Sequence, residues 1–137
     1  MINDVNWKMT IFFLLIFFSS ITSYAQTKNW VAPASADKLV NPYKTSLEAV
    51  SSGKVTYNAM CVICHGDKGK GNGAASVSLT TPPANFLSIS VRDESDGAIF
   101  WKLSEGNPPM ASYKTMLTEK QRWEVVNYIR KLENPSK

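Results

Sequence analysis

Apolar residues recur at helical spacing near the carboxyl end of the chain and predict a long helix over residues 118–134. They fall at positions i, i+3, i+4 and i+7, which places one apolar stripe along the helix: Val125, Tyr128, Ile129 and Leu132. Thr118 followed three residues later by Gln121 is the pattern of a capping box. Asn134-Pro135 ends the helix.

A second apolar pattern predicts a first helix over residues 46–64, which contains Val50, Tyr57 and Met60. Gly53 lies inside this helix, where a glycine costs about 1 kcal/mol relative to alanine. Two interpretations of that glycine stay open. Either another backbone approaches closely at Gly53, or the stretch breaks there into two short helices.

A shorter helix is predicted over residues 97–104, capped by Asp96 and ending at Gly106. Its apolar residues form one buried face: Ile99, Phe100 and Leu103. The segment 66–73 has too many glycines for regular structure and lacks the spacing of a phosphate-binding loop, so we expect tight turns there. Prolines make residues 80–86 extended. The predicted fold is a small all-α domain.

The first 25 residues predict a signal peptide. Lys8 precedes an apolar run over residues 11–18, and small residues follow up to Ala25, the expected cleavage point. The run is shorter than the roughly 20 apolar residues of a membrane-spanning helix, although an uncleaved anchor stays an alternative. We therefore expect a periplasmic or otherwise exported protein. Residues 26–45 predict an extended arm or linker, in which Trp30 and Tyr43 could contact the domain.

Composition narrows the possible partners. The 137 residues are enough for one domain, and an apolar fraction of 44% allows a compact core. The formal net charge is +4, and no basic stripe of the kind that binds nucleic acid is present. Lys68, Lys70 and Lys114 are either ordinary solvated residues, the interpretation we favour, or part of a docking surface for acidic partners.

The segment Cys61-Val62-Ile63-Cys64-His65 contains both cysteines and the one histidine of the chain. C-x-x-C-H is the attachment sequence of a covalently bound haem, in which the two thiols bind the haem and the imidazole binds its iron. Three alternatives are weaker. A thioredoxin-like site would follow a strand, a structural zinc site needs four ligands, and an exported disulfide would leave the adjacent histidine unexplained.

The sixth position of a haem iron bound by His65 needs another ligand, and methionine is the available residue type. Met60 adjoins the first cysteine and cannot reach the opposite haem face. Met110 lies in a loop stiffened by Pro108-Pro109, which favours it as the distal ligand, as in the Met/His pairs of cytochromes c. Met116 as ligand, an open site, or Met110 as a gap-filling core residue remain alternatives.

The sequence resembles a small monohaem cytochrome c with histidine–methionine ligation over residues 46–134. The resemblance rests on the C-x-x-C-H motif with the glycines that follow it, up to Gly71. Five further groups of residues contribute: Gly53 with Tyr57, Pro82-Pro83, residues 96–101, Met110 with Tyr113, and residues 123–128. It implies three to four helices around one haem c, with the first and last helices crossing at Gly53. It also implies that Pro83 or Pro82 accepts a hydrogen bond from the imidazole. The haem-pocket residues we expect are Pro83, Phe86, Trp101 and Tyr113.

The function that this resemblance implies is one-electron transfer rather than enzyme catalysis. The protein would be a monomer that carries electrons between exported or membrane-bound redox partner proteins. Membrane contact would come only through those partners, unless the leader is retained. A haem subunit of a membrane respiratory or dehydrogenase complex is the main alternative. A haem enzyme or gas sensor with a labile sixth ligand is a weaker one.

Overall fold

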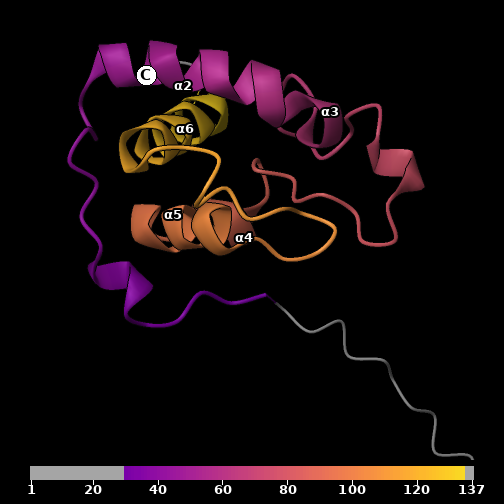
Figure 1. Cartoon of the computed structure of the whole chain (residues 1–137), viewed down its shortest axis with the longest axis horizontal. Helices are drawn as coiled ribbons and strands as arrows, with labels where there is room; N and C mark the ends of the chain where they lie inside the picture. The colour runs from indigo at the N-terminus through magenta and orange to yellow at the C-terminus, as the bar shows by residue number, and fades with distance from the viewer. Residues whose placement is uncertain (1–29, 135–137) are drawn as a thin grey trace, which may run out of the picture.

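The computed structural model describes residues 30–134, and this part of the chain is helical without a strand (Figure 1). Its α-helices are α2 (Leu47–Met60), α3 (Val62–His65), α4 (Ile89–Arg92), α5 (Asp96–Glu105) and α6 (Glu119–Glu133). Two short 3-10 helices are η1 (Ala36–Lys38) and η2 (Ser76–Ser78). The all-α prediction is confirmed. The predicted signal peptide lies outside the described residues, and none of the helices within them is long and apolar enough to cross a membrane.

The crossing of α2 and α6 is the centre of the fold, and α6 lies between α2 and α5 (Figure 1). A β-carbon added to Gly53 would lie 1.9 Å from the carbonyl oxygen of Glu124, so the two backbones touch at this glycine. One turn further along, the rings of Tyr57 and Tyr128 meet edge to face with their centroids 5.1 Å apart. Close backbone approach, the first interpretation of Gly53, is therefore confirmed.

Helix α5 completes the core with the face that the sequence predicted. Ile99 and Leu103 are buried, and the ring of Phe100 stacks on Trp123 of α6 at a centroid distance of 3.9 Å. The predicted cap at Asp96 is wrong by one residue. Ser95 is the N-cap, and its hydroxyl accepts a hydrogen bond from the Ala98 amide at 3.0 Å. The Asp96 carboxylate instead faces α6.

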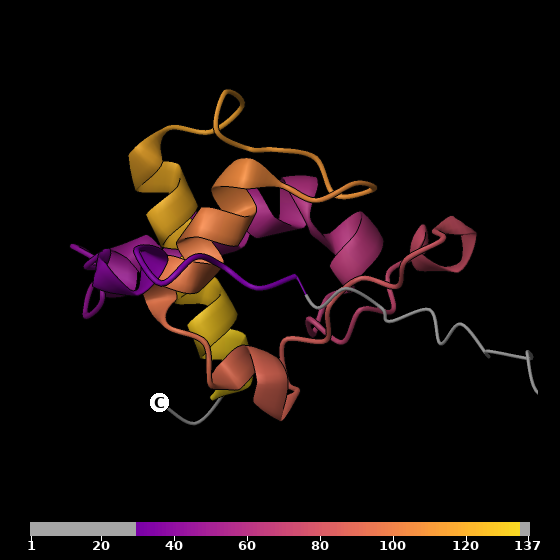
Figure 2. The same cartoon turned by 90° about the horizontal axis from the view of Figure 1, so that it is seen from below.

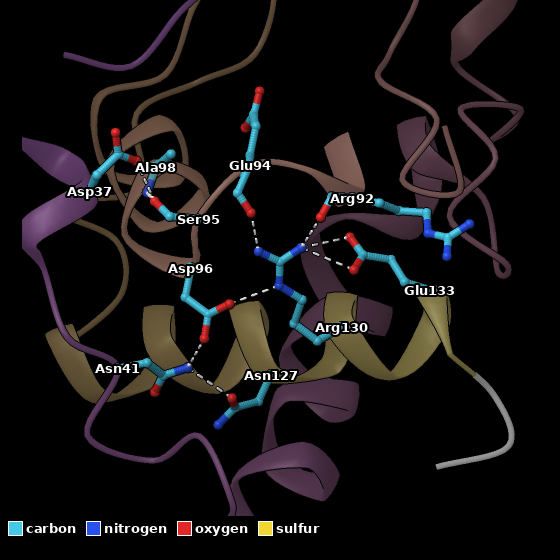
Figure 3. Close-up of polar contacts among 10 residues, drawn as sticks. All are labelled: Asp37, Asn41, Arg92, Glu94, Ser95, Asp96, Ala98, Asn127, Arg130 and Glu133. Atoms are coloured by element: carbon cyan, nitrogen blue, oxygen red, sulfur yellow. Dashed lines mark hydrogen bonds and ion pairs between the residues drawn. The ribbon is translucent and has the colours of Figure 1, made fainter. Parts of the chain in front are cut away.

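Figure 3 shows what Asp96 binds there. The Arg130 guanidinium donates to Asp96 at 2.7 Å, to Glu133 at 3.0 Å, and to the backbone carbonyl of Glu94. Asn41 of the arm donates to the other Asp96 oxygen at 3.1 Å. These contacts connect the end of α6 to the start of α5 and to the arm, around an open cleft of about 940 Å³.

Residues 30–45 form an arm whose first part, up to η1, lies across α5 (Figure 2), and whose second part runs along the side of the domain to α2 (Figure 1). It contains the turn of η1 and a second turn at residues 42–45, just before α2. A β-carbon on Gly97 would lie 2.0 Å from the Ala36 carbonyl oxygen. The Trp30 ring lies 6.4 Å from that of Trp101. The Tyr43 carbonyl accepts a hydrogen bond from Asn127 at 2.8 Å. Both predicted contacts of the arm with the domain are therefore present.

Candidate haem-binding site

The cysteine–histidine motif forms a helical turn of its own. The predicted single helix over residues 46–64 is wrong at this point, because α2 ends at Met60 and α3 begins at Val62. At Cys61 the backbone has φ −113° and ψ −33°, which turns the chain out of the α2 path. The His65 amide then donates to the Cys61 carbonyl at 2.8 Å. The two cysteines and the histidine are thus presented by one short turn.

The two cysteines are free thiols, Cys61 buried and Cys64 half-buried. Burial, and to a smaller extent Cys64, raises the pKa of Cys61 to about 12, so Cys61 is a neutral thiol near pH 7. A helix precedes the motif, where a thioredoxin-like site would have a strand. Within residues 30–134 no three His, Cys, Asp or Glu side chains gather as a metal-ion site.

The orientation of His65 is fixed by a backbone carbonyl. Its Nδ1 lies 3.1 Å from the carbonyl oxygen of Ala84, and its ring stacks on Phe86 with centroids 4.5 Å apart and an interplanar angle of 16°. Since a carbonyl can only accept, Nδ1 carries the hydrogen and the lone pair of Nε2 is free for a metal. Burial lowers the pKa of His65, against the opposing effect of the Ala84 bond, which favours this neutral imidazole.

The acceptor predicted from the resemblance, Pro83 or Pro82, is corrected to Ala84. The contacts of the glycine-rich loop 66–73 explain why the Ala84 carbonyl, and not that of Pro83, faces His65. Gly71 has φ +75°, and a β-carbon on it would lie 2.4 Å from the Pro83 carbonyl oxygen. That oxygen therefore faces the loop, and the next carbonyl along, that of Ala84, faces the imidazole.

Met110 lies in the loop 106–117, which leads from α5 to α6. Asn107 and Met110 exchange two backbone hydrogen bonds, at 3.0 and 2.9 Å, and so close a tight turn around Pro108-Pro109. Met110 is half-buried and packs against the core, whereas Met116 is 49% exposed. The loop and the segment 66–88 both extend toward the side of the molecule where α3 lies (Figure 1, Figure 2).

Two other predicted pocket residues, Tyr113 and Trp101, lie in different parts of the structure. Tyr113 lies near the motif: its hydroxyl donates to the Met60 carbonyl at 3.2 Å. Burial, and then the neighbouring Cys61 and Cys64, raises its pKa. Trp101, by contrast, lies against Trp30 of the arm.

Sequence reasoning missed two contacts that support the motif. Besides Ala84, the Tyr57 hydroxyl donates to the Gly66 carbonyl at 2.7 Å and so holds the chain just after His65. Both acceptors are backbone carbonyls, which every residue type provides. Tyr57 itself could have indicated such a contact, because the hydroxyl of a buried tyrosine usually has a hydrogen-bond partner.

Residues 48–129 match the family model described as cytochrome C oxidase, cbb3-type, subunit III. The chain belongs to this family of cytochrome c domains. No curated protein matches the sequence. Among solved structures, a chain of the Kuenenia stuttgartiensis reducing HAO-like protein complex has a similar fold, with a TM-score of 0.60 at 20% identity. The match covers 69% of this chain and 49% of that one, so the present chain spans about half of its neighbour.

A cytochrome c domain implies a haem c, and the donor set here fits one. Two free thiols and a neutral imidazole lie on one turn, and the imidazole keeps its Nε2 lone pair available. A further candidate donor is the thioether of Met110, on a loop that reaches the same side of the molecule (Figure 1).

Proposed function

We propose that this protein is a one-electron carrier with a single, covalently attached haem c. The hydrogen bond between His65 Nδ1 and Ala84 is the observation that carries the proposal, because it leaves Nε2 as the ligand atom. Cys61 and Cys64 would form the thioether links to the haem, and His65 and Met110 would bind its iron. When bound, the haem supplies an iron that is reversibly oxidised and reduced by one electron.

The protein residues adapt this centre to electron transfer rather than catalysis. The Met110 thioether would occupy the sixth position, which leaves no site for a substrate and favours the ferrous state. The hydrogen bond to the Ala84 carbonyl would keep the His65 ring in one orientation when the iron gains or loses an electron. Phe86 stacks against the same ring and keeps water from it. A rigid, saturated centre needs little rearrangement when one electron arrives or leaves.

Partner proteins would dock beside the attachment motif. Ile63, between the two cysteines, is 56% exposed, and Val77 on the adjacent η2 is 90% exposed. The Ala75 amide donates to the Ile63 carbonyl at 2.8 Å, which holds these two segments together. An exposed apolar surface of this kind suits brief docking of another redox protein. Because of the predicted signal peptide, we infer that the carrier works in the periplasm or another exported compartment. We propose further that it is a monomer.

A haem subunit of a membrane respiratory complex is the second candidate. The description of the matched family, an oxidase subunit, favours it, and the structural neighbour is itself part of a complex. Mass spectrometry of the mature protein separates the two. A chain that starts near Gln26, and that is a monomer by size-exclusion chromatography, supports the free carrier. A chain that retains the leader supports the subunit.

The ligand set is tested by optical spectroscopy of protein produced with haem-maturation machinery. We expect a c-type ferrous spectrum and a methionine-to-iron band at the red edge of the ferric spectrum. Met110→Ala should abolish that band, lower the reduction potential and let the ferrous protein bind carbon monoxide, because the sixth position opens. The control Met116→Ala removes an exposed methionine of the same loop and should leave all three readouts unchanged. Loss of the band in Met116→Ala alone would reassign the ligand, and a wild type without a c-type spectrum would refute the proposed function.

A further inference from the structure

One side chain connects the methionine loop to the attachment motif. The Tyr113 hydroxyl donates to the carbonyl of Met60, the residue directly before Cys61, at 3.2 Å. The Tyr113 amide donates to the carbonyl of Leu103 in α5 at 3.1 Å. Next to it, the Ser112 hydroxyl donates to the carbonyl of Ser104 at 2.6 Å. The loop is therefore held to α5 by its neighbouring residues and to the motif by the phenol.

The break at Cys61 explains why the Met60 carbonyl needs this partner. In an uninterrupted helix the Met60 carbonyl would accept a hydrogen bond from the Cys64 amide, four residues on. Here the Cys64 amide donates to Cys61 instead, at 3.2 Å. The Met60 carbonyl is thus one of the unpaired acceptors that a helix leaves at its end. The half-buried hydroxyl of Tyr113, from another part of the chain, donates the hydrogen bond that the Met60 carbonyl lacks within the helix.

We propose that Tyr113 is a positioning residue, which keeps the Met110 thioether in place as the distal ligand through its hydrogen bond to Met60. The proposal rests on the function proposed above. Met110 lies three residues before Tyr113, so a loop fixed at Tyr113 has little freedom to carry the thioether away. The Met110 thioether would then stay close to a bound haem iron, and its high effective concentration would favour it over a competing ligand from solution.

Competition with imidazole in the ferric, haem-loaded protein measures this effect. Tyr113→Phe keeps the ring and removes the hydroxyl. A net hydrogen bond of about 0.5–1.5 kcal/mol corresponds to a rise in imidazole affinity of roughly 2- to 12-fold, because the methionine-off state becomes more populated. Backbone hydrogen exchange at Met110 should accelerate by a similar factor. This second readout does not depend on electron transfer.

Tyr57→Phe is the matched control. It also removes one phenolic hydroxyl, whose hydrogen bond to the Gly66 carbonyl is 2.7 Å long, but on the histidine side of the motif. We expect Tyr57→Phe to lower the urea midpoint while it changes imidazole affinity by less than about twofold.

Each outcome decides the proposal. Tighter imidazole binding and faster Met110 exchange in Tyr113→Phe alone support it. No change in Tyr113→Phe, with the wild-type methionine band intact, overturns the positioning role and leaves the proposed function standing. An equal increase in Tyr113→Phe and Tyr57→Phe indicates general loosening and overturns it as well. A wild type that lacks the methionine band refutes the ligand assignment and this inference together.

Discussion

The helix crossing and the site loops are held together in different ways. At the crossing, α2 and α6 meet through the backbone contact at Gly53, and Tyr57 and Val126 beside it are 0% exposed. The site is built from the α3 turn and two loops, residues 66–88 and 106–117, and the loops are fixed by backbone hydrogen bonds, left-handed glycines and single tyrosine hydroxyls. Burial therefore stabilises the first region, and local conformation shapes the second.

This difference teaches where stability and chemistry lie in a small haem domain. The crossing contains none of the proposed haem ligands, while the loops carry Met110 and the Ala84 carbonyl. Loops with few buried apolar contacts open at a lower free-energy cost than packed helices do. A substitution at the crossing should therefore unfold the whole domain, and one in a loop should alter the site first.

Gly53→Ala is expected to have the largest effect, because it breaks the crossing. The added β-carbon would lie 1.9 Å from the Glu124 carbonyl oxygen, and a backbone oxygen cannot rotate away. The helices must separate, so we expect a loss of at least about 3 kcal/mol in the free energy of unfolding, or failure to fold. Urea unfolding followed by circular dichroism measures it. Ser51→Ala, an exposed position of the same helix, should stay within about 0.5 kcal/mol of wild type.

The same contrast decides what could be predicted from the sequence. The α6 capping box and the contact at Gly53 were predictable from residue types. Thr118 and Gln121 form a capping pattern, the apolar residues recur at helical spacing, and a glycine inside a predicted helix indicates close packing. The break at Cys61 and the Ala84 acceptor were not, since both depend on backbone groups that every residue shares. Helix α4 has only four residues, Ile89–Arg92, and a single turn shows no period. The ligand role of Met110 stays a prediction, because it depends on a bound haem.

Gly71→Ala makes the same glycine-to-alanine change in a site loop that Gly53→Ala makes at the helix crossing. Gly71 has φ +75°, which costs an L-residue about 1–2 kcal/mol, and its new β-carbon would lie 2.4 Å from the Pro83 carbonyl oxygen. We expect a loss of about 2 kcal/mol in unfolding free energy, smaller than at Gly53 because a loop can shift more easily than two packed helices. The shift should also weaken the Ala84 bond, which makes His65 less basic and raises the reduction potential.

Spectroelectrochemistry beside urea unfolding separates the two effects of Gly71→Ala. Lys70→Ala changes an exposed neighbour in the same loop without a left-handed residue and should move neither quantity. If Gly71→Ala destabilised the domain as much as Gly53→Ala and left the potential unchanged, the loop would be part of the stabilising core rather than of the site.

Thr118→Ala, with the smallest expected effect, probes the boundary where the methionine loop becomes α6. The Thr118 hydroxyl accepts from the Gln121 amide at 3.2 Å, and its loss leaves one amide of the first turn unpaired. This should cost about 1 kcal/mol in unfolding free energy, while Thr115→Ala in the exposed loop should cost less than about 0.5 kcal/mol. The methionine band should be unchanged, because Tyr113 holds the loop on the Met110 side of the cap. A weakened band in Thr118→Ala would place the start of α6 within the ligand-holding unit and move the boundary between the two regions past the cap.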